Sequence, residues 1–183
     1  MSDQRNFSLR KAKLSDRDSL RALIAQSALE LSARYYERRQ IDAALQGAFG
    51  VDTSLIEDGT YFIAETPATL VGCGGWSRRK TRFGGDKFSR RDSALLDPAS
   101  EPARIRAFFV HPSWARKGVG RAILDRCESE AARAGFRAFE LMSTLPGVPF
   151  YQACGYTRRA LLHFDLTEDV QIDFVPMEKR AAE

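Results

Sequence analysis

The chain has 183 residues, a length that fits one domain, and its 44% hydrophobic content is sufficient for a packed core. No apolar run approaches the roughly 20 residues needed to cross a bilayer, and the N-terminal stretch lacks the apolar core of a signal peptide. Three widely spaced cysteines without a CxxC pair, together with two histidines, exclude a disulfide framework and a metal cluster and favour a reducing cytoplasm.

The first quarter of the chain predicts one strand and two helices. Residues 7–11 alternate like a strand, and Ser15 with Asp18 resembles a helix-capping pair. An amphipathic helix then follows, and a second helix is expected over about 37–49. Tyr35 and Tyr36 lie between these helices, where packing against the core or the wall of a site is favoured over contact with a substrate.

Two strands follow, at 60–66 and 70–77, and the short turn between them favours an antiparallel hairpin. The second strand contains Gly72, Gly74 and Gly75. Glycines weaken a strand, so this pattern indicates a bulge or a point of close approach.

The basic character of the protein is concentrated in residues 78–91. This segment has seven Lys and Arg side chains against one Asp, a net charge of +6, which leaves −2 for the rest of the chain. We expect a mobile basic loop over about 78–102. Nucleic-acid binding by its arginines and phenylalanines is an open alternative, and a solvated loop is favoured over it.

Residues 104–124 have the form of an anion site. An apolar strand leads through a proline turn into Lys117, Gly118, Val119, Gly120 and Arg121, and then into a helix that ends near 134. The first N–H groups of a helix have no partner within the helix, and the helix dipole adds positive charge there. The stretch is neither a Walker A loop nor a dinucleotide fingerprint, so alone it indicates only a phosphate or pyrophosphate site.

The C-terminal part predicts a strand at 137–144, a short helix at 150–154, and strands at 157–166 and 170–179. Strand, helix and strand between 104 and 143 form a βαβ unit whose strands should be parallel. Because hairpins flank this unit, the expected class is α/β with a mixed sheet. Cys127 falls on the apolar stripe of the central helix and should be a core residue.

The order of strand, Gly-x-Gly, helix and strand, followed by FYQACGY at 150–156, resembles the GCN5-related N-acetyltransferase (GNAT) superfamily. The match covers about residues 104–156. It implies one domain over 1–183 with a mostly antiparallel sheet, a central parallel βαβ unit and helices on both faces. One position departs from the family pattern: Ala115 stands where the family has Gln or Arg, with Arg116 beside it.

The resemblance implies acetyl-CoA, or another acyl-CoA, as donor, and no metal. In the family, the pantetheine arm binds along the strand before the glycine loop, where the two parallel strands separate. The residues implied in binding CoA are Phe109, Val110, Arg116, Lys117, Gly118, Val119, Gly120 and Arg121. Because Ala115 removes one side chain from the loop, binding should depend mainly on backbone groups.

The implied chemistry is direct attack of an amine on the thioester. The Val110 N–H is the candidate donor to the oxyanion, and Tyr151 matches the position of the family's usual acid. Glu140 is the candidate base, directly or through water, although an outward-facing charge is as plausible. Glu30 and Asp58 are more distant candidates, and His111 is favoured as a turn residue.

The sequence is consistent with three functions. The first is acetyl transfer to an unidentified amine of a small molecule or protein. The second is a non-enzymatic acyl-CoA-binding sensor or interaction module of the same fold, and the third, least favoured, is nucleic-acid binding. No membrane contact is expected, and because many family members are dimers a homodimer stays open.

Overall fold

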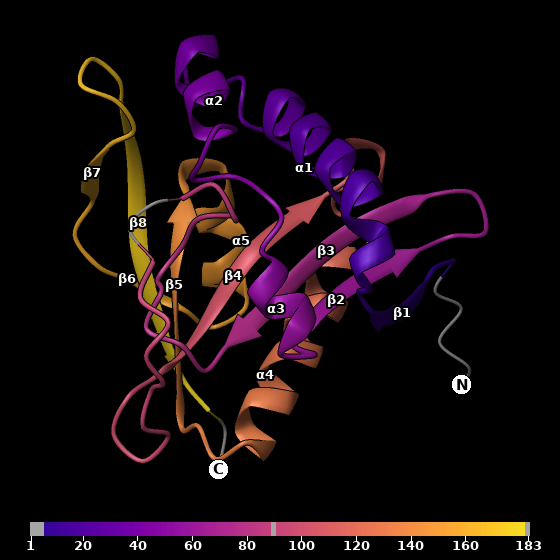
Figure 1. The fold of residues 1–183 in the computed structure, drawn as a ribbon, viewed down its shortest axis with the longest axis vertical. Coiled ribbons are helices and arrows are strands. Elements are labelled where there is room, and N and C mark those ends of the chain that lie inside the picture. The colour runs from indigo at the N-terminus through magenta and orange to yellow at the C-terminus, as the bar shows by residue number, and fades with distance from the viewer. Residues whose placement is uncertain (1–5, 89–90, 182–183) are drawn as a thin grey trace.

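The computed structural model describes residues 6–88 and 91–181 as helices packed on one mixed sheet (Figure 1). The α-helices are α1 (Arg17–Leu31), α2 (Arg38–Ala44), α3 (Thr53–Glu57), α4 (Val119–Arg133) and α5 (Val148–Ala153). The strands are β1 (Ser8–Lys11), β2 (Tyr61–Glu65), β3 (Leu70–Ser77), β4 (Ala103–Val110), β5 (Ala138–Thr144), β6 (Thr157–Arg158), β7 (Leu162–Asp165) and β8 (Gln171–Arg180). Short 3-10 helices η1 (Leu14–Asp16), η2 (Pro112–Trp114) and η3 (Leu145–Gly147) connect some of them.

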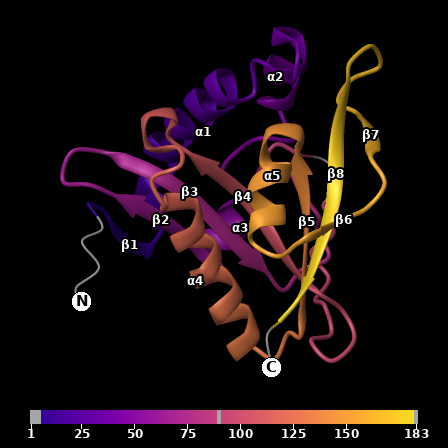
Figure 2. The ribbon, with the colours of Figure 1, turned by 180° about the vertical axis from the view of Figure 1, so that it is seen from behind.

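The strand order is β1-β2-β3-β4-β5-β8-β6, with β7 also paired to β8. Every pairing is antiparallel except β4 with β5, which confirms the mostly antiparallel sheet with its parallel βαβ unit. Helices α1, α2 and α3 cover one face, and α4 and α5 cover the other (Figures 1 and 2). Two buried apolar clusters, one on each face, form the core, and Cys127 lies in the cluster under α4 as predicted.

The two parallel strands separate soon after they meet. Their pairing covers Ala103–Phe139, Arg104–Glu140 and Ile105–Leu141 and then stops, while β5 remains paired with β8 as far as Thr144. In Figure 2, α5 lies across the opening that results. The divergence leaves one edge of β4 without a neighbouring strand.

The glycines of β3 permit both features that their pattern predicts. The register with β4 shifts between Cys73 and Gly75, which is a β-bulge, and Ala107 opposite adopts a left-handed φ of 52°. A Cβ at Gly74 would collide with the Phe108 ring, and one at Gly72 would lie 2.5 Å from Val119 of α4. Gly72 therefore lets α4 approach the sheet, and Gly74 makes room for the bulged strand.

The entry to the first helix differs from the expected capping pair. The backbone N–H of Lys13 donates to the Asp16 carboxylate at 2.7 Å, and Arg10 binds the same carboxylate. Asp18, in contrast, pairs with Arg21 at the surface. Asp16 therefore takes the acidic position expected of Asp18, and Lys13 stands at the N-cap position expected of Ser15. The β1 residue Arg10 holds the Asp16 carboxylate in place.

Residues 37–50 also depart from the single helix expected over 37–49. Helix α2 ends at Ala44, and the chain folds back so that the Phe49 N–H donates to the Ala44 carbonyl. The Gly47 carbonyl then accepts from the Gly85 N–H at 3.0 Å, and this contact with the basic loop favours a turn over more helix. Helix α3 was not expected. Its cap is Asp52, whose carboxylate accepts from the Ser54 N–H.

The single strand expected over 157–166 is divided into β6 and β7. Both pair with β8, at Glu178–Met177 and at Phe174–Gln171 respectively. Pro176 of β8 lies between those two sets of pairs and has no N–H to donate, so the ladder is interrupted there. The hairpin of β7 with β8 is confirmed. Across the described ranges, no helix is long and apolar enough to span a bilayer.

Candidate functional site

A cleft of about 970 Å³ opens where β4 and β5 separate. Its walls come from the end of α1, the turn after α2, the basic loop, β4, β5, α5 and the glycine loop before α4. Of the residues predicted to bind CoA, the lining includes Phe109, Val110, Arg116, Gly118, Gly120 and Arg121, and Tyr151 lies there too. The separation of the strands thus brings most of the predicted set together.

The loop of residues 115–118 before α4, the glycine loop, lies at one end of this cleft. Arg116 and Gly118 both have left-handed backbone, with φ of 62° and 83°, and α4 begins directly afterwards. No backbone acceptor within the described chain takes the N–H groups of Gly118, Val119, Gly120 and Arg121. Alternating left-handed residues at a helix N-terminus leave such groups pointing to one place, as an anion requires.

The backbone N–H of Lys117, unlike those of the residues that follow it, already has a partner. Its N–H donates to the Trp114 carbonyl at 3.3 Å, and its ammonium group lies 5.4 Å from the centre of the Trp114 ring. Arg121 donates from its guanidinium to the Ala153 carbonyl at 3.0 Å, which joins α4 to α5. Lys117 and Arg121 thus each have a contact with the protein, whereas Arg116 lines the cleft. The N–H groups of residues 118–121 are the unpaired backbone donors beside these cations.

The open edge of β4 presents the backbone of Val110. The His111 N–H donates to the Val71 carbonyl at 2.9 Å, and Val110 pairs with Gly72 one position further along. Because antiparallel pairing alternates between bonded and non-bonded pairs, the Val110 N–H and carbonyl point away from β3 into the gap. By the same alternation the backbone of Phe109 faces β3, so Phe109 contributes its ring to the cleft.

The bulge in β4 sets which side chains face which layer. Arg106 and Ala107 both lie on the α3 side, Phe108 on the α4 and α5 side, and the Ala107 carbonyl accepts from the Tyr61 hydroxyl at 3.1 Å. The Phe108 ring then packs 6.1 Å from the ring of Tyr151. The bulge therefore places an aromatic wall beside the open edge.

Tyr151 lies on α5 against this aromatic wall. Its ring packs against those of Phe108, Phe150 and Tyr156 at centroid distances of 5.0–6.1 Å. Within the described chain no hydrogen-bond partner holds its hydroxyl, and burial raises the pKa of Tyr151 well above its usual value. The group therefore carries its proton at neutral pH, and its hydroxyl has no partner within the described chain that would compete for that proton.

The predicted carboxylates occupy three different surroundings. Glu140 does not line the cleft. It is ion-paired with Arg104, and Arg82 lies 3.7 Å from it. Asp58 binds Arg79 at 2.7 Å, away from the cleft, whereas Glu30 lines it. His111 caps η2 by accepting from the Ser113 N–H, which confirms its place in a turn.

The two tyrosines between the first helices have different positions. Tyr36 is buried, and its hydroxyl donates to the Asp173 carbonyl at 2.7 Å and accepts from the Leu145 N–H at 2.8 Å. It ties the α1–α2 connection to β8 and to the turn before α5. Tyr35 is 51% exposed and lines the mouth of the cleft.

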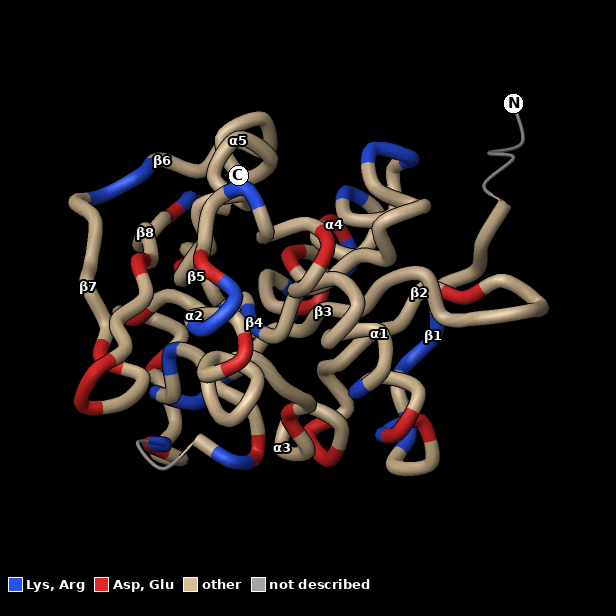
Figure 3. The backbone as a smooth tube through the Cα atoms, turned by 90° about the horizontal axis from the view of Figure 1, so that it is seen from above, with Lys and Arg blue, Asp and Glu red and all other residues tan. Residues whose placement is uncertain are grey.

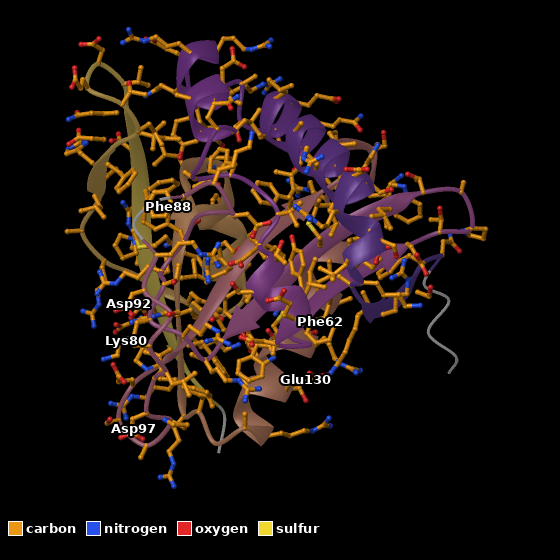
Figure 4. All side chains as sticks on the ribbon, in the orientation of Figure 1. Phe62, Lys80, Phe88, Asp92, Asp97 and Glu130 are labelled. Carbon is orange, nitrogen blue, oxygen red and sulfur yellow. The ribbon has the colours of Figure 1, made fainter. Side chains whose placement is uncertain are left out.

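The basic loop contributes a wall of the cleft that sequence reasoning did not find. Residues 82–84 line it, and Arg79 and Arg91 pin the loop to Asp58 and Asp52. The ring of Phe88, labelled in Figure 4, packs 5.1 Å from the ring of Phe83 between centroids. The aromatic residues interleaved with the arginines were the one local signal. Mobility of the segment stays a prediction, and Arg90 lies outside the described residues.

Charge is distributed rather than gathered on one face. In Figure 3 the blue Lys and Arg segments interleave with red Asp and Glu segments along the chain. The part of the chain that the structure describes holds no group of three or more His, Cys, Asp and Glu side chains suited to a metal ion.

Comparisons with known proteins bear on the family and the fold. The sequence model described as "Acetyltransferase (GNAT) domain" matches residues 57–158, and no curated protein sequence matches. A GCN5-related N-acetyltransferase from Rhodopseudomonas palustris is similar in structure, with TM-score 0.71, 17% identity and coverage of 98% of this chain and 99% of that one.

Two further structures were determined with ligands. PaiA N-acetyltransferase from Thermoplasma acidophilum, in complex with coenzyme A, aligns with TM-score 0.65, 15% identity and 96% and 99% coverage of this chain and that one. YncA, a putative acetyltransferase from Salmonella typhimurium with acetyl-CoA, aligns with TM-score 0.63, 17% identity and 98% and 96% coverage. At these identities the likeness concerns the fold.

Proposed function

The chain belongs to the GNAT family of acetyltransferases, and on that premise we propose that it transfers an acetyl group from acetyl-CoA to an amine. The observation that supports this most directly is that one cleft contains both a backbone anion site and a strand edge without a neighbouring strand. The first suits a pyrophosphate, and the second suits the amide-bearing pantetheine arm that joins the pyrophosphate to the thioester.

The residues present fit acetyl-CoA. The N–H groups of Gly118, Val119, Gly120 and Arg121 would hold the pyrophosphate, with Arg116 and Lys117 adding positive charge around it. The Val110 backbone would bond the pantetheine arm beside the Phe109 ring. Because backbone N–H groups would supply donors to the pyrophosphate whatever the side chain, the departure at Ala115 would not remove the site.

Bound acetyl-CoA would supply the thioester, at which a C–N bond to the amine forms and the C–S bond breaks. The Val110 N–H would donate a hydrogen bond to the carbonyl oxygen as that oxygen gains negative charge. The Tyr151 hydroxyl would pass its proton to the departing sulfur. The attacking ammonium must first lose a proton. Glu140, acting through water, remains the proposed acceptor of that proton, with Glu30 as the carboxylate that lines the cleft.

The test is acetyl-CoA-dependent release of free thiol with a panel of primary amines. The wild-type chain should release thiol with at least one amine. Tyr151→Phe should lower kcat about 10²- to 10³-fold and leave the Kd for CoA within about twofold, because the ring and its packing are retained.

A different pattern of results would identify the non-enzymatic alternative. Tight CoA binding with no thiol release across the panel would indicate an acyl-CoA-binding module. In that case Tyr151→Phe should leave the biological activity of the protein unchanged. Absence of CoA binding would remove both functions.

A further inference from the structure

The half of the cleft away from the glycine loop has an unusual set of charged side chains. Its lining as a whole includes five arginines and, among the described residues, a single carboxylate, Glu30. Arg116 and Arg121 lie at the anion loop. Arg106 is buried, and the buried Asp52 carboxylate 2.5 Å away offsets its charge. Glu30, Arg34 and Arg82 are left to face an acceptor.

Arg34 and Arg82 are not matched by carboxylates of their own. Glu30 precedes Arg34 by four residues, yet Glu30 accepts from Gln26 at 3.1 Å, and Arg34 forms no ion pair within the described chain. Arg82 lies 3.7 Å from Glu140, a carboxylate that Arg104 already engages. Two guanidinium groups thus stand at the cleft with unsatisfied donors, a setting suited to a carboxylate.

The same half of the cleft has an aromatic wall. Phe49 packs 5.8 Å from Phe109 and 6.3 Å from Phe174, and Phe83 packs 5.2 Å from Phe174, between ring centroids. All four line the cleft. A continuous wall of rings favours an apolar body in the ligand rather than a fully polar one.

From these two observations we infer that the acceptor is a small amine with both a carboxylate and an apolar body, an amino acid with an apolar side chain. Arg34 and Arg82 bind its carboxylate, and the ring wall packs its side chain. This inference rests on the proposed function, since it names the substrate class of the same site. The lysine side chain of a protein does not fit it, because that amine carries no adjacent carboxylate.

The experiment compares three acceptors that share a ring and an amine: L-phenylalanine, L-phenylalaninamide and phenethylamine. Rates are corrected for the unprotonated fraction of each amine. We expect kcat/KM for L-phenylalanine to exceed that of the other two at least tenfold. An N-terminal phenylalanine peptide, which has the ring and the amine but a distant carboxylate, should behave like the amide.

Charge-removing variants then test the two arginines. Arg34→Gln with Arg82→Gln should raise KM for L-phenylalanine about tenfold and leave KM for phenethylamine unchanged. Arg133→Gln is the matched control, because Arg133 is an exposed arginine at the end of α4 that does not line the cleft. It should leave both values unchanged.

Equal kcat/KM for the three small acceptors, a preference for the peptide, or an equal effect of the double variant on all acceptors would overturn the inference while acyl transfer stands. If no acceptor reacts, L-phenylalanine is titrated calorimetrically into CoA-saturated protein. Binding that the double variant loses would support the inference, and no binding would overturn it. CoA binding in the same sample reports separately on the proposed function.

Discussion

Gly120 lies where a side chain would enter the cleft. A Cβ there would sit 3.2 Å from the Phe150 ring and 3.7 Å from Val110, beside the N–H groups expected to face pyrophosphate. Gly120→Leu should therefore reduce CoA affinity below detection, whereas Lys117→Ala should weaken it only about threefold, as expected for an exposed cation. Isothermal titration with CoA measures both, and thermal melting of each variant controls for folding.

A variant at Gly118 tests the effect of backbone conformation separately from the effect of a steric clash. A Cβ would meet nothing within 4 Å, but φ of 83° is unfavourable for any residue with a side chain, by roughly 1–2 kcal/mol. Gly118→Ala should thus fall between the other two variants. Small and equal losses for all three changes would contradict a backbone-based site.

Glu140 can be assigned by a single substitution. Its carboxylate pairs with Arg104, whose side chain is 9% exposed, so Glu140→Gln leaves a nearly buried cation without its partner. We expect a loss of about 1–3 kcal/mol in the free energy of unfolding and, because Glu140 is the proposed base, loss of the acidic limb of the pH profile of kcat. Urea unfolding and rate measurements from pH 5 to 9 check both. A pH profile that stays intact while stability falls would contradict the base role and leave Glu140 only its pairing with Arg104.

At the scale of elements, Asp52 joins α3, β4 and the basic loop. It is fully buried and receives Arg91 at 2.7 Å and Arg106 at 2.5 Å. Asp52→Asn should cost about 3–5 kcal/mol of stability, because it leaves two cations facing a neutral group. It should also expose the basic loop to trypsin.

The matched control is Asp42→Asn. Asp42 pairs with Arg38 on the exposed face of α2, so its loss should change stability by less than about 0.5 kcal/mol. Similar results for the two variants, in urea unfolding and in the rate of tryptic cleavage, would show that the buried network does not hold the loop.

Elements with strong local patterns were predictable, and those defined by distant contacts were not. The strand predicted at 70–77 has the same bounds as β3. The helix predicted from the amphipathic stripe agrees with α4 to within one residue at each end. Helix α3 is too short to show periodicity, and its Asp52 cap is recognisable mainly from its partners. The division of β6 from β7 depends on Pro176 in another strand, which no local window contains.

At the scale of the molecule, buried tyrosines couple stability to alkaline pH. Burial raises the pKa of Tyr36 from 10.0 to about 12, and the pKa values of Tyr61, Tyr151 and Tyr156 are also raised. Above pH 10 the unfolded chain releases these protons while the folded chain retains them, so stability falls as pH rises from 10 towards 12.

The expected slope is at most about 1.4 kcal/mol per pH unit for each retained proton. Urea unfolding at pH 8, 10 and 11 measures it. Tyr36→Phe should unfold at lower urea at pH 8, because two hydrogen bonds are lost, yet show a shallower decline above pH 10. A slope identical to that of the wild-type chain would contradict the contribution of Tyr36.

The two halves of the cleft differ in how far sequence could define them. The half proposed to bind CoA is built from one contiguous stretch and the motif at 150–156, so the residues that line it could be predicted from sequence. The half proposed for the acceptor combines the end of α1, the turn at 48–50, residues 82–84 and the bulged part of β4. These segments meet only in the fold, and each is locally unremarkable, so Arg34, Arg82 and Phe49 were not foreseen.

The early parting of β4 and β5 also has a consequence for folding. The half-sheet of β1 to β4 and the half-sheet of β5 to β8 are joined through three residue pairs. A donor arm bonded to Val110 would then act as a substitute strand, completing β-structure that the polypeptide leaves unfinished. Any ligand of the folded state stabilises it by RT ln(1 + [L]/Kd). The stability of the contact between the two half-sheets would therefore depend on donor concentration, and it would be lowest when the donor is scarce.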